Sequence, residues 1–260
     1  WNLDAVSSEG KVILDKDAQA TCAEYAQWCI DHRSEIPGWF PVDAAQKTFQ
    51  DSYPFHPSVL SVFERKWRGL PKFQQTRGVL RLLALWVSRA YKEGYEGAHR
   101  DSLIALGTAP MEESTFRTAS FEQLGERNLE TAVTTDIAGS IGAHAVRLDQ
   151  ESTPVIKQAR LHRKVATTIF FESNGGQGKD RHEATGPEIR LAVGEPDVEI
   201  GNVATALDAL ATACYYLTVE RANYRFSMKE NLNKRFSDRR ATIQIPAVTD
   251  RVKKEIQALC

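Results

Sequence analysis

Residues 70–83 read LPKFQQTRGVLRLL, and residues 53–57, shortly upstream, read YPFHP. The apolar spacing predicts a helix over residues 72–92 that buries Phe73, Leu80, Leu83, Val87 and Tyr91. Arg77 and Arg81 then lie about one helical turn apart on a polar flank, where both guanidinium groups can reach the same ligand. Arginine suits bidentate contact with phosphate, so the pair is a candidate phosphate sensor. The alternative is that both are ordinary surface cations.

These two strings resemble the lid segment of a large, poorly characterised bacterial AAA+-type ATPase family, often encoded beside DNA methylases in presumed phage-defence loci. The resemblance extends from about Tyr53 to Phe236. It implies a winged helix after the lid, and ATP with Mg²⁺ as cofactors of the full-length protein only. It also implies γ-phosphate sensing by Arg77 or Arg81. The implied partners are an ATPase core missing from this chain, DNA, and a DNA methylase or helicase.

The chain lacks the motifs that an ATPase needs to bind and hydrolyse ATP. It contains no G-x-x-x-x-G-K-[ST] string, and residues 172–180 (ESNGGQGKD) have unsuitable glycine spacing and an aspartate in place of the hydroxyl. We expect a flexible loop there. No apolar run ends in paired carboxylates, so we assign no catalytic residue and no metal ligand. The chain begins at Trp1, and we expect a non-catalytic fragment of a longer protein.

Composition predicts a globular protein and excludes a membrane-spanning one. The 260 residues are 42% hydrophobic and 26% charged, with a net charge of −1 and no long apolar run. The charge is uneven, because residues 51–100 carry nine Lys/Arg and four Asp/Glu, whereas residues 101–150 carry three and eight. The cysteines at 22, 29, 214 and 260 form no zinc-binding pattern. We expect buried, reduced thiols in a cytoplasmic protein.

The order of predicted elements indicates a mainly α fold with a small β component. A helical lid-like domain covers residues 1–97, a connecting region 98–154, a winged-helix-like domain 155–240, and the start of a following segment 241–260. Residues 119–134 are predicted as one helix. Residues 154–171 fit either a helix or a strand, and the near-helical spacing of Ile156, Leu161, Val165 and Ile169 favours a helix.

The winged helix is predicted from a sequence of short signals. Thr185-Gly186-Pro187 caps a short helix, a second helix covers residues 198–213, and alternating residues around 220–223 predict a β-hairpin. The second helix has acids and no Lys or Arg, so we expect it to pack against protein. The hairpin and the segment after it are basic, and the candidate nucleic-acid contacts there are Arg221, Arg225, Lys229, Lys234 and Arg235. A solvated charged face is the alternative.

Two other functions stay open. In the first, the chain is a winged-helix adaptor that binds protein or nucleic acid and has no role with nucleotides. In the second, it is an unrelated enzyme that uses the glycines of residues 174–178. His56, between two prolines, is predicted to be a packing residue. Arg160, His162, Arg163 and Lys164 form a basic cluster that is predicted to lie on a solvated helix face, with a nucleic-acid contact as the alternative. Asp136, Asp149, His144 and His182 show no spacing that assembles a triad or a metal site.

Overall fold

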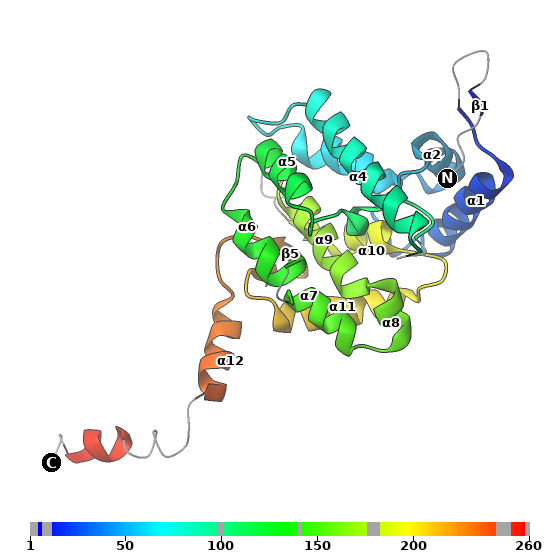
Figure 1. Cartoon of the computed structure of the whole chain (residues 1–260). Coiled ribbons are helices and arrows are strands. Elements are labelled where there is room, and N and C mark those ends of the chain that lie inside the picture. The colour runs from blue at the N-terminus through cyan, green and yellow to red at the C-terminus, as the bar shows by residue number, and fades with distance from the viewer. Residues whose placement is uncertain are drawn as a thin grey trace.

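The computed structural model describes residues 5–6, 12–97, 101–139, 142–175, 183–242 and 251–257. The described chain is mainly helical with a small antiparallel sheet, which confirms the predicted fold class. Its α-helices are α1 (Lys16–Asp31), α2 (Ala45–Ser52), α3 (Pro57–Val62), α4 (Arg77–Tyr95), α5 (Ser114–Leu124), α6 (Leu129–Ala132), α7 (His144–Glu151), α8 (Pro154–Ala159), α9 (Leu161–Ser173), α10 (Gly186–Val193), α11 (Ile200–Ala213) and α12 (Leu232–Thr242). Figure 1 shows α4 and α5 on one side of α9, and α7, α8 and α11 on the other.

Shorter elements connect these helices. The 3-10 turns are η1 (Val42–Ala44) and η3 (Leu106–Thr108), and the π-helical turns are η2 (Phe63–Trp67) and η4 (Val133–Ile137). The strands are β1 (Ala5–Val6), β2 (Val12–Ile13), β3 (Ala184–Thr185), β4 (Leu217–Glu220) and β5 (Asn223–Phe226). Of the described helices, none is both long and apolar enough to cross a bilayer.

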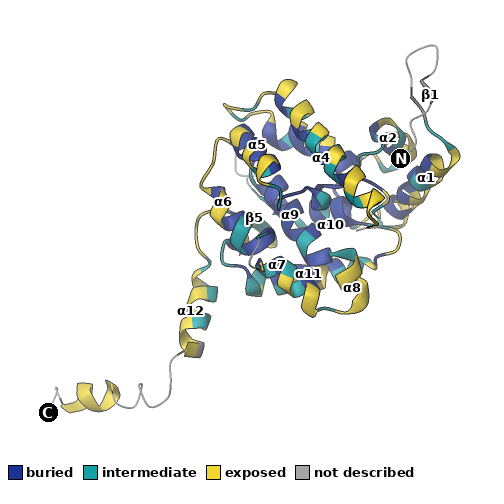
Figure 2. Cartoon of the chain, viewed as in Figure 1, coloured by how far each residue is buried: buried dark blue, intermediate teal, exposed yellow. Residues whose placement is uncertain are grey.

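Helix α9 is the centre of the molecule. Nearly all of its residues are buried, and it packs against η3, α7, α10, α11 and β5 (Figure 2). Its buried residues include polar and charged groups as well as apolar ones, so other elements surround this helix on almost every side. This burial explains why the β-branched and aromatic run of residues 165–171 forms a helix despite its strand propensity. The prediction of a helix here is confirmed.

The segment from α9 to β5 has the element order of a winged helix. Strand β5 lies between β3 and β4, and all neighbours are antiparallel. The hairpin pairs Leu217 with Phe226, and its two turn residues, Arg221 and Ala222, both have positive φ angles, as a type I′ turn requires. The predicted cap is confirmed, because Thr185 and Glu188 form a capping box at the start of α10.

The N-terminal helices form a second hydrophobic cluster. Helices α1 and α2 bury Cys22, Trp28, Phe49 and neighbouring residues, and Leu191 of α10 joins them. The Trp28 ring lies against Gly194, where a side-chain carbon would be 2.1 Å from the ring. His56 is buried against Phe49, with ring centroids 5.1 Å apart, and caps α3 by accepting a hydrogen bond from the Ser58 N–H. The prediction that His56 is a packing residue is confirmed.

Two predictions about helices were wrong. Helix α4 buries Gly78, Leu82, Trp86 and Ala90, whereas the predicted core residues Leu80 and Tyr91 are 61% and 67% exposed. Apolar residues surround most of this helix, so their spacing could not identify the buried face. The predicted helix over 119–134 is broken, because Gly125 adopts a φ of 76° and ends α5 before α6 begins.

One hydrophobic core joins α4 to the winged helix. The cluster includes Leu82 and Trp86 of α4, Phe171 of α9 and Phe226 of β5. Trp86 and Trp67 both stack on Phe171, with ring centroids 5.6 Å and 5.4 Å from it. The domain boundaries at residues 97, 154 and 240 stay predictions, but the predicted lid-like helices and the winged helix share their interior.

Candidate functional site

An open pocket at the start of α4 brings the two predicted phosphate sensors together. Arg77 is the first residue of α4 and Arg81 lies one turn later, and both are exposed. The pocket has a volume of about 790 Å³ and is lined by Pro71, Lys72, Phe73, Gln74, Arg77, Gly78, Arg81, Glu122 and Gln123. Both arginines therefore reach the same space, as the spacing predicted.

The contact between α4 and α5 fixes the shape of this pocket. Gln123 of α5 packs directly on Gly78, where a side-chain carbon would be 2.2 Å from its Oε1 atom. The same Oε1 accepts a hydrogen bond of 2.8 Å from the Gln74 N–H. Gln123 thus holds the segment before α4 against the first turn of the helix. Only glycine at position 78 leaves room for this arrangement.

The pocket carries an excess of positive charge. Lys72, Arg77 and Arg81 line it, and Glu122 is the only carboxylate among its described lining residues. Arg81 pairs with Glu122 at 3.1 Å, but the two side chains are 56% and 41% exposed. Such an exposed pair contributes at most about 1 kcal/mol and exchanges readily. Arg77 and Lys72 form no ion pair with any described residue, so the pocket favours an anion.

The five basic residues predicted to contact nucleic acid fall into two groups. Lys234 pairs with Asp238 at 2.8 Å, and Arg235 pairs with Glu230 at 2.7 Å. Arg221 at the hairpin turn, Arg225 on β5 and Lys229 beyond it are exposed and have no ion-pair partner among the described residues. The Arg235 pair is as exposed as that of Arg81, with side chains 51% and 43% exposed, so Arg235 also stays open to a ligand. Lys234 is the predicted contact that its partner holds in a less exposed pair.

Helix α11, which occupies the place of a recognition helix, presents no cation. Its exposed residues include Gly201, Ala204, Thr205, Asp208 and Thr212. Insertion into a DNA groove normally brings cations toward phosphates. The exposed face of α11 is therefore unsuited to groove binding, in agreement with the sequence.

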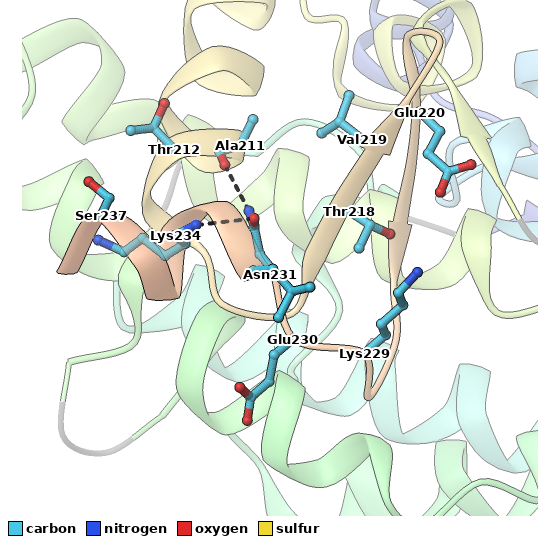
Figure 3. Close-up of a pocket in the computed structure, with 11 residues that line it drawn as sticks. Ala211, Thr212, Thr218, Val219, Glu220, Lys229, Glu230, Asn231, Lys234 and Ser237 are labelled. Carbon is cyan, nitrogen blue, oxygen red and sulfur yellow. Dashed lines mark hydrogen bonds between the residues drawn. The ribbon is translucent and has the colours of Figure 1, made fainter. Parts of the chain in front are cut away.

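A second pocket lies between α11, the hairpin and α12 (Figure 3). Asn231 holds its walls together, because its side-chain amide donates to the Ala211 carbonyl at 3.4 Å and accepts from the Lys234 N–H at 3.2 Å. Its volume is about 610 Å³. Two acids, Glu220 and Glu230, and two lysines line it, so its charges balance and favour no ligand class.

A buried cluster of two cations and two carboxylates lies away from both pockets. Arg65 of η2 binds Glu172 at 2.9 Å and Glu188 at 2.8 Å, and Lys66 binds Glu188 at 3.2 Å. The Arg65 guanidinium also lies 3.9 Å from the centre of the Trp39 ring. The cluster joins η2 to α9 and α10. Sequence analysis missed it, and its only signal was a run of three charged residues between the apolar residues Phe63 and Trp67.

Burial and pairing shift the pKa values of the two carboxylates in opposite directions. Burial raises the pKa of Glu172 to about 7, although Arg65 and Lys66 oppose this effect. Burial also raises the pKa of Glu188, but Lys66, the Thr185 N–H and Arg65 outweigh it and lower the pKa overall. Glu188 is therefore the anion that balances the cations throughout the neutral range.

The sequence also missed two Asp–His pairs. Asp136 is fully buried and accepts hydrogen bonds from His144 Nδ1 at 2.9 Å and from the N–H groups of Tyr215 and Tyr216. It thereby anchors the start of the hairpin. Asp149 pairs with His162 at 2.9 Å. Neither pair adjoins a third ligand, and the described residues contain no cluster suited to a metal ion.

The predicted solvated face of α9 was wrong. His162 and Lys164 are each 3% exposed, because Lys164 binds Asp101 at 2.7 Å and also contacts Glu195. Gly107 also packs closely on the Lys164 backbone, where a side-chain carbon would lie 2.8 Å from the Lys164 Cα. These groups stabilise the fold and do not face a ligand.

The remaining candidates from the sequence are the cysteines, His182 and the glycine-rich loop. Cys22, Cys29 and Cys214 are buried and unpaired, as predicted, and burial raises the pKa of Cys22 to about 11. Cys260 and His182 lie outside the described residues, as do residues 176–182 of the glycine-rich loop. Comparison with family models, with curated proteins and with solved structures found no match for this chain.

Proposed function

We propose that this chain is the lid and winged-helix region of an AAA+-type ATPase, in which Arg77 and Arg81 respond to the γ-phosphate of ATP. One observation carries the proposal. Arg77 and Arg81 line one positively charged pocket, while the opposite face of the same helix belongs to the core of the winged helix. A phosphate bound in the pocket would therefore act on a helix that is packed against the winged helix.

The shared core supports a coupled movement. Trp86 of α4 stacks on Phe171 of α9, and Ser173 of α9 accepts a hydrogen bond of 3.1 Å from the Phe226 N–H on β5. Because packed interiors deform little, α4, α9 and the hairpin are expected to move as one body. Loss of the γ-phosphate on hydrolysis would release the arginines and let this body rotate.

ATP and Mg²⁺ belong to the full-length protein in this proposal. This chain contributes Arg77 and Arg81 and no magnesium ligand, and the ATPase core supplies the phosphate-binding loop. The proposed setting is the cytoplasm, and the proposed target of the movement is a DNA-processing partner such as a methylase or helicase, in phage defence.

The test is steady-state ATP hydrolysis by the full-length protein with Arg77→Ala or Arg81→Ala. We expect turnover to fall at least about tenfold in one or both variants, because a charge-assisted contact in the transition state is lost. Lys92→Ala is the matched control, because Lys92 is an exposed cation in the last turn of the same helix. Turnover equal to that of the control in both arginine variants would refute the proposal.

A second candidate function is that of a winged-helix adaptor, which binds nucleic acid and needs no ATP. The exposed and unpaired Arg221, Arg225 and Lys229 support it. We expect a fluorescent DNA duplex to bind this chain in a salt-sensitive manner, and Arg221→Ala with Arg225→Ala to reduce the salt slope by about 1 to 2. Lys92→Ala is the control, because Lys92 is an exposed cation on α4 and is not one of the predicted nucleic-acid contacts. Absence of binding at low salt would exclude this function.

A further inference from the structure

The pocket at the start of α4 contains a polar group that the arginines do not explain. Gln123 is 7% exposed and lines the pocket. Its Oε1 atom accepts the Gln74 N–H, but its Nε2 donates a hydrogen bond to no described residue. The Nε2 atom is not a buried atom that lacks a partner, so it is free to donate into the open pocket. The floor of the pocket therefore offers a donor to an acceptor from outside.

Lys72 adds a third cation on another side of the same pocket. Its side-chain stem lies across Gly125, where a side-chain carbon would be 3.1 Å from the Lys72 Cδ. The left-handed backbone of Gly125 and the absence of a side chain there keep this path open. Lys72 precedes α4, whereas Arg77 and Arg81 lie on it, so the cations approach the pocket from different segments.

The four donors are spread over more than one phosphate. Arg77 and Arg81 lie one helical turn apart and can hold one phosphate between them. Lys72 and the Gln123 amide approach the same pocket of about 790 Å³ from other segments. Every free group in this set is a donor, and arginine and lysine bind phosphate and carboxylate groups. An anion with several linked phosphate groups fits this arrangement.

We infer that the pocket binds a polyphosphate chain, with one phosphate held by Arg77 and Arg81 and a second held by Lys72 and the Gln123 Nε2. This inference deepens the proposed function, because it names the ligand class of the same pocket and adds two residues that contact it. It does not require the ATPase core, so it can be tested on this chain alone.

The experiment is calorimetric titration of this chain, at low ionic strength, with inorganic tripolyphosphate, pyrophosphate, phosphate and citrate. Tripolyphosphate is expected to bind about tenfold more tightly than phosphate, because it reaches both pairs of donors. Citrate, an anion of comparable charge with carboxylates in place of phosphates, is expected to bind more weakly than tripolyphosphate. Equal affinity for citrate would mean that the pocket only collects anions, and would overturn the inference.

Variants of this chain then distinguish residues that contact the ligand from residues that only support the pocket. Lys72→Ala is expected to weaken tripolyphosphate binding about tenfold, and Lys72→Arg to retain it. Gln123→Glu keeps the acceptor for the Gln74 N–H, removes the donor and adds a negative charge, so a merely structural role would leave binding close to that of a variant with the same added charge. Gln74→Glu adds the same charge to the lining without removing the donor, and is expected to weaken binding less than Gln123→Glu. Lys92→Ala is the neutral control.

The outcomes distinguish this inference from the proposed function. If Arg77→Ala and Arg81→Ala abolish binding while Lys72→Ala and Gln123→Glu do not, the two added residues are wrong and the arginine sensors stand. If tripolyphosphate does not bind at all, the inference fails, and the turnover measurement on the full-length protein still decides the proposed function. Thermal unfolding of each variant shows whether a loss of binding reflects a loss of folding.

Discussion

The guanidinium group of Arg65 binds both oxygens of the Glu172 carboxylate, at 2.9 Å and 3.3 Å, although the two residues are 107 positions apart. Arg65 belongs to η2, next to α3, and Glu172 belongs to α9, the first helix of the winged helix. This bond, with those of Lys66 and Glu188, joins η2 to α9 and α10 across a largely buried interface.

Arg65→Ala is expected to lower the free energy of unfolding by about 3 kcal/mol, because removal of one partner leaves a buried carboxylate uncompensated. Urea denaturation measures this change. The control is Arg68→Ala, because Arg68 forms only an exposed pair with Glu64 at 3.8 Å, and a loss below about 0.5 kcal/mol is expected there. Similar losses in the two variants would show that the cluster does not stabilise this interface.

Glu172 gives the stability a pH dependence. Burial raises its pKa to about 7, so between the ordinary value of about 4.3 and about 7 the folded chain holds a proton that the unfolded chain has released. The contribution of this proton to the free energy of unfolding is complete below about pH 4.3 and is lost as the pH rises to about 7. The amide introduced by Glu172→Gln does not titrate. The free energy of unfolding of Glu172→Gln, minus that of wild type, is therefore expected to rise through this window by at most about 1.4 kcal/mol per pH unit.

Urea denaturation at several pH values between 4.5 and 8 measures this difference. Above pH 7 the difference is expected to level off, because Glu172 is then ionised in both states. A difference that is constant over the whole range would contradict the raised pKa of Glu172.

His56 is expected to change the stability of the fold with pH in the opposite direction. Burial lowers its pKa to about 3, whereas an unfolded histidine titrates near about 6.5. Stability is thus expected to fall as the pH drops from about 6.5 toward 3, since only the unfolded chain takes up the proton. His56→Asn keeps a side chain that can cap α3 and cannot titrate. The variant should lose less stability on acidification than wild type, and an equal loss would show that His56 does not carry the effect.

Two glycines of α4 should respond in opposite ways to alanine. Gly78→Ala would place a carbon 2.2 Å from the Gln123 Oε1, and is expected to cost about 1 to 3 kcal/mol through overpacking. Gly94→Ala meets no atom within 4 Å, and is expected to add about 0.5 to 1 kcal/mol through helix propensity. Thermal unfolding measures both changes. Gln123→Ala combined with Gly78→Ala should recover part of the loss, and no recovery would show that the clash lies elsewhere.

The sequence predicted those features that depend on near neighbours. The capping box joins Thr185 and Glu188, which are three positions apart, and the hairpin of β4 and β5 is joined by two turn residues, so local chemistry determines both. Arg77 and Arg81 are also local, because helical spacing alone places them one turn apart. These parts of the fold and of the candidate site were correctly expected.

Features that depend on distant contacts could not be predicted. The buried face of α4 depends on contacts with α5 and α9, such as those of Trp86 with Phe116 and Phe171, and nothing in the α4 sequence distinguishes Leu82 from Leu80. The partners of Arg65 lie 107 and 123 residues away. Lys164 is buried only because the loop at Asp101 and the residue Glu195 supply carboxylates to it. Gln123, which lines the pocket at the start of α4 from the neighbouring helix α5, belongs to this group as well.

The most direct test of the central claim is a comparison of kcat for ATP hydrolysis in the full-length protein, with Arg77→Ala and Arg81→Ala measured beside Lys92→Ala. The account predicts a fall in kcat of at least about tenfold for one or both arginine variants, with unchanged thermal unfolding and wild-type turnover in the control. Turnover in both arginine variants that equals the control would show that this pocket does not sense nucleotide.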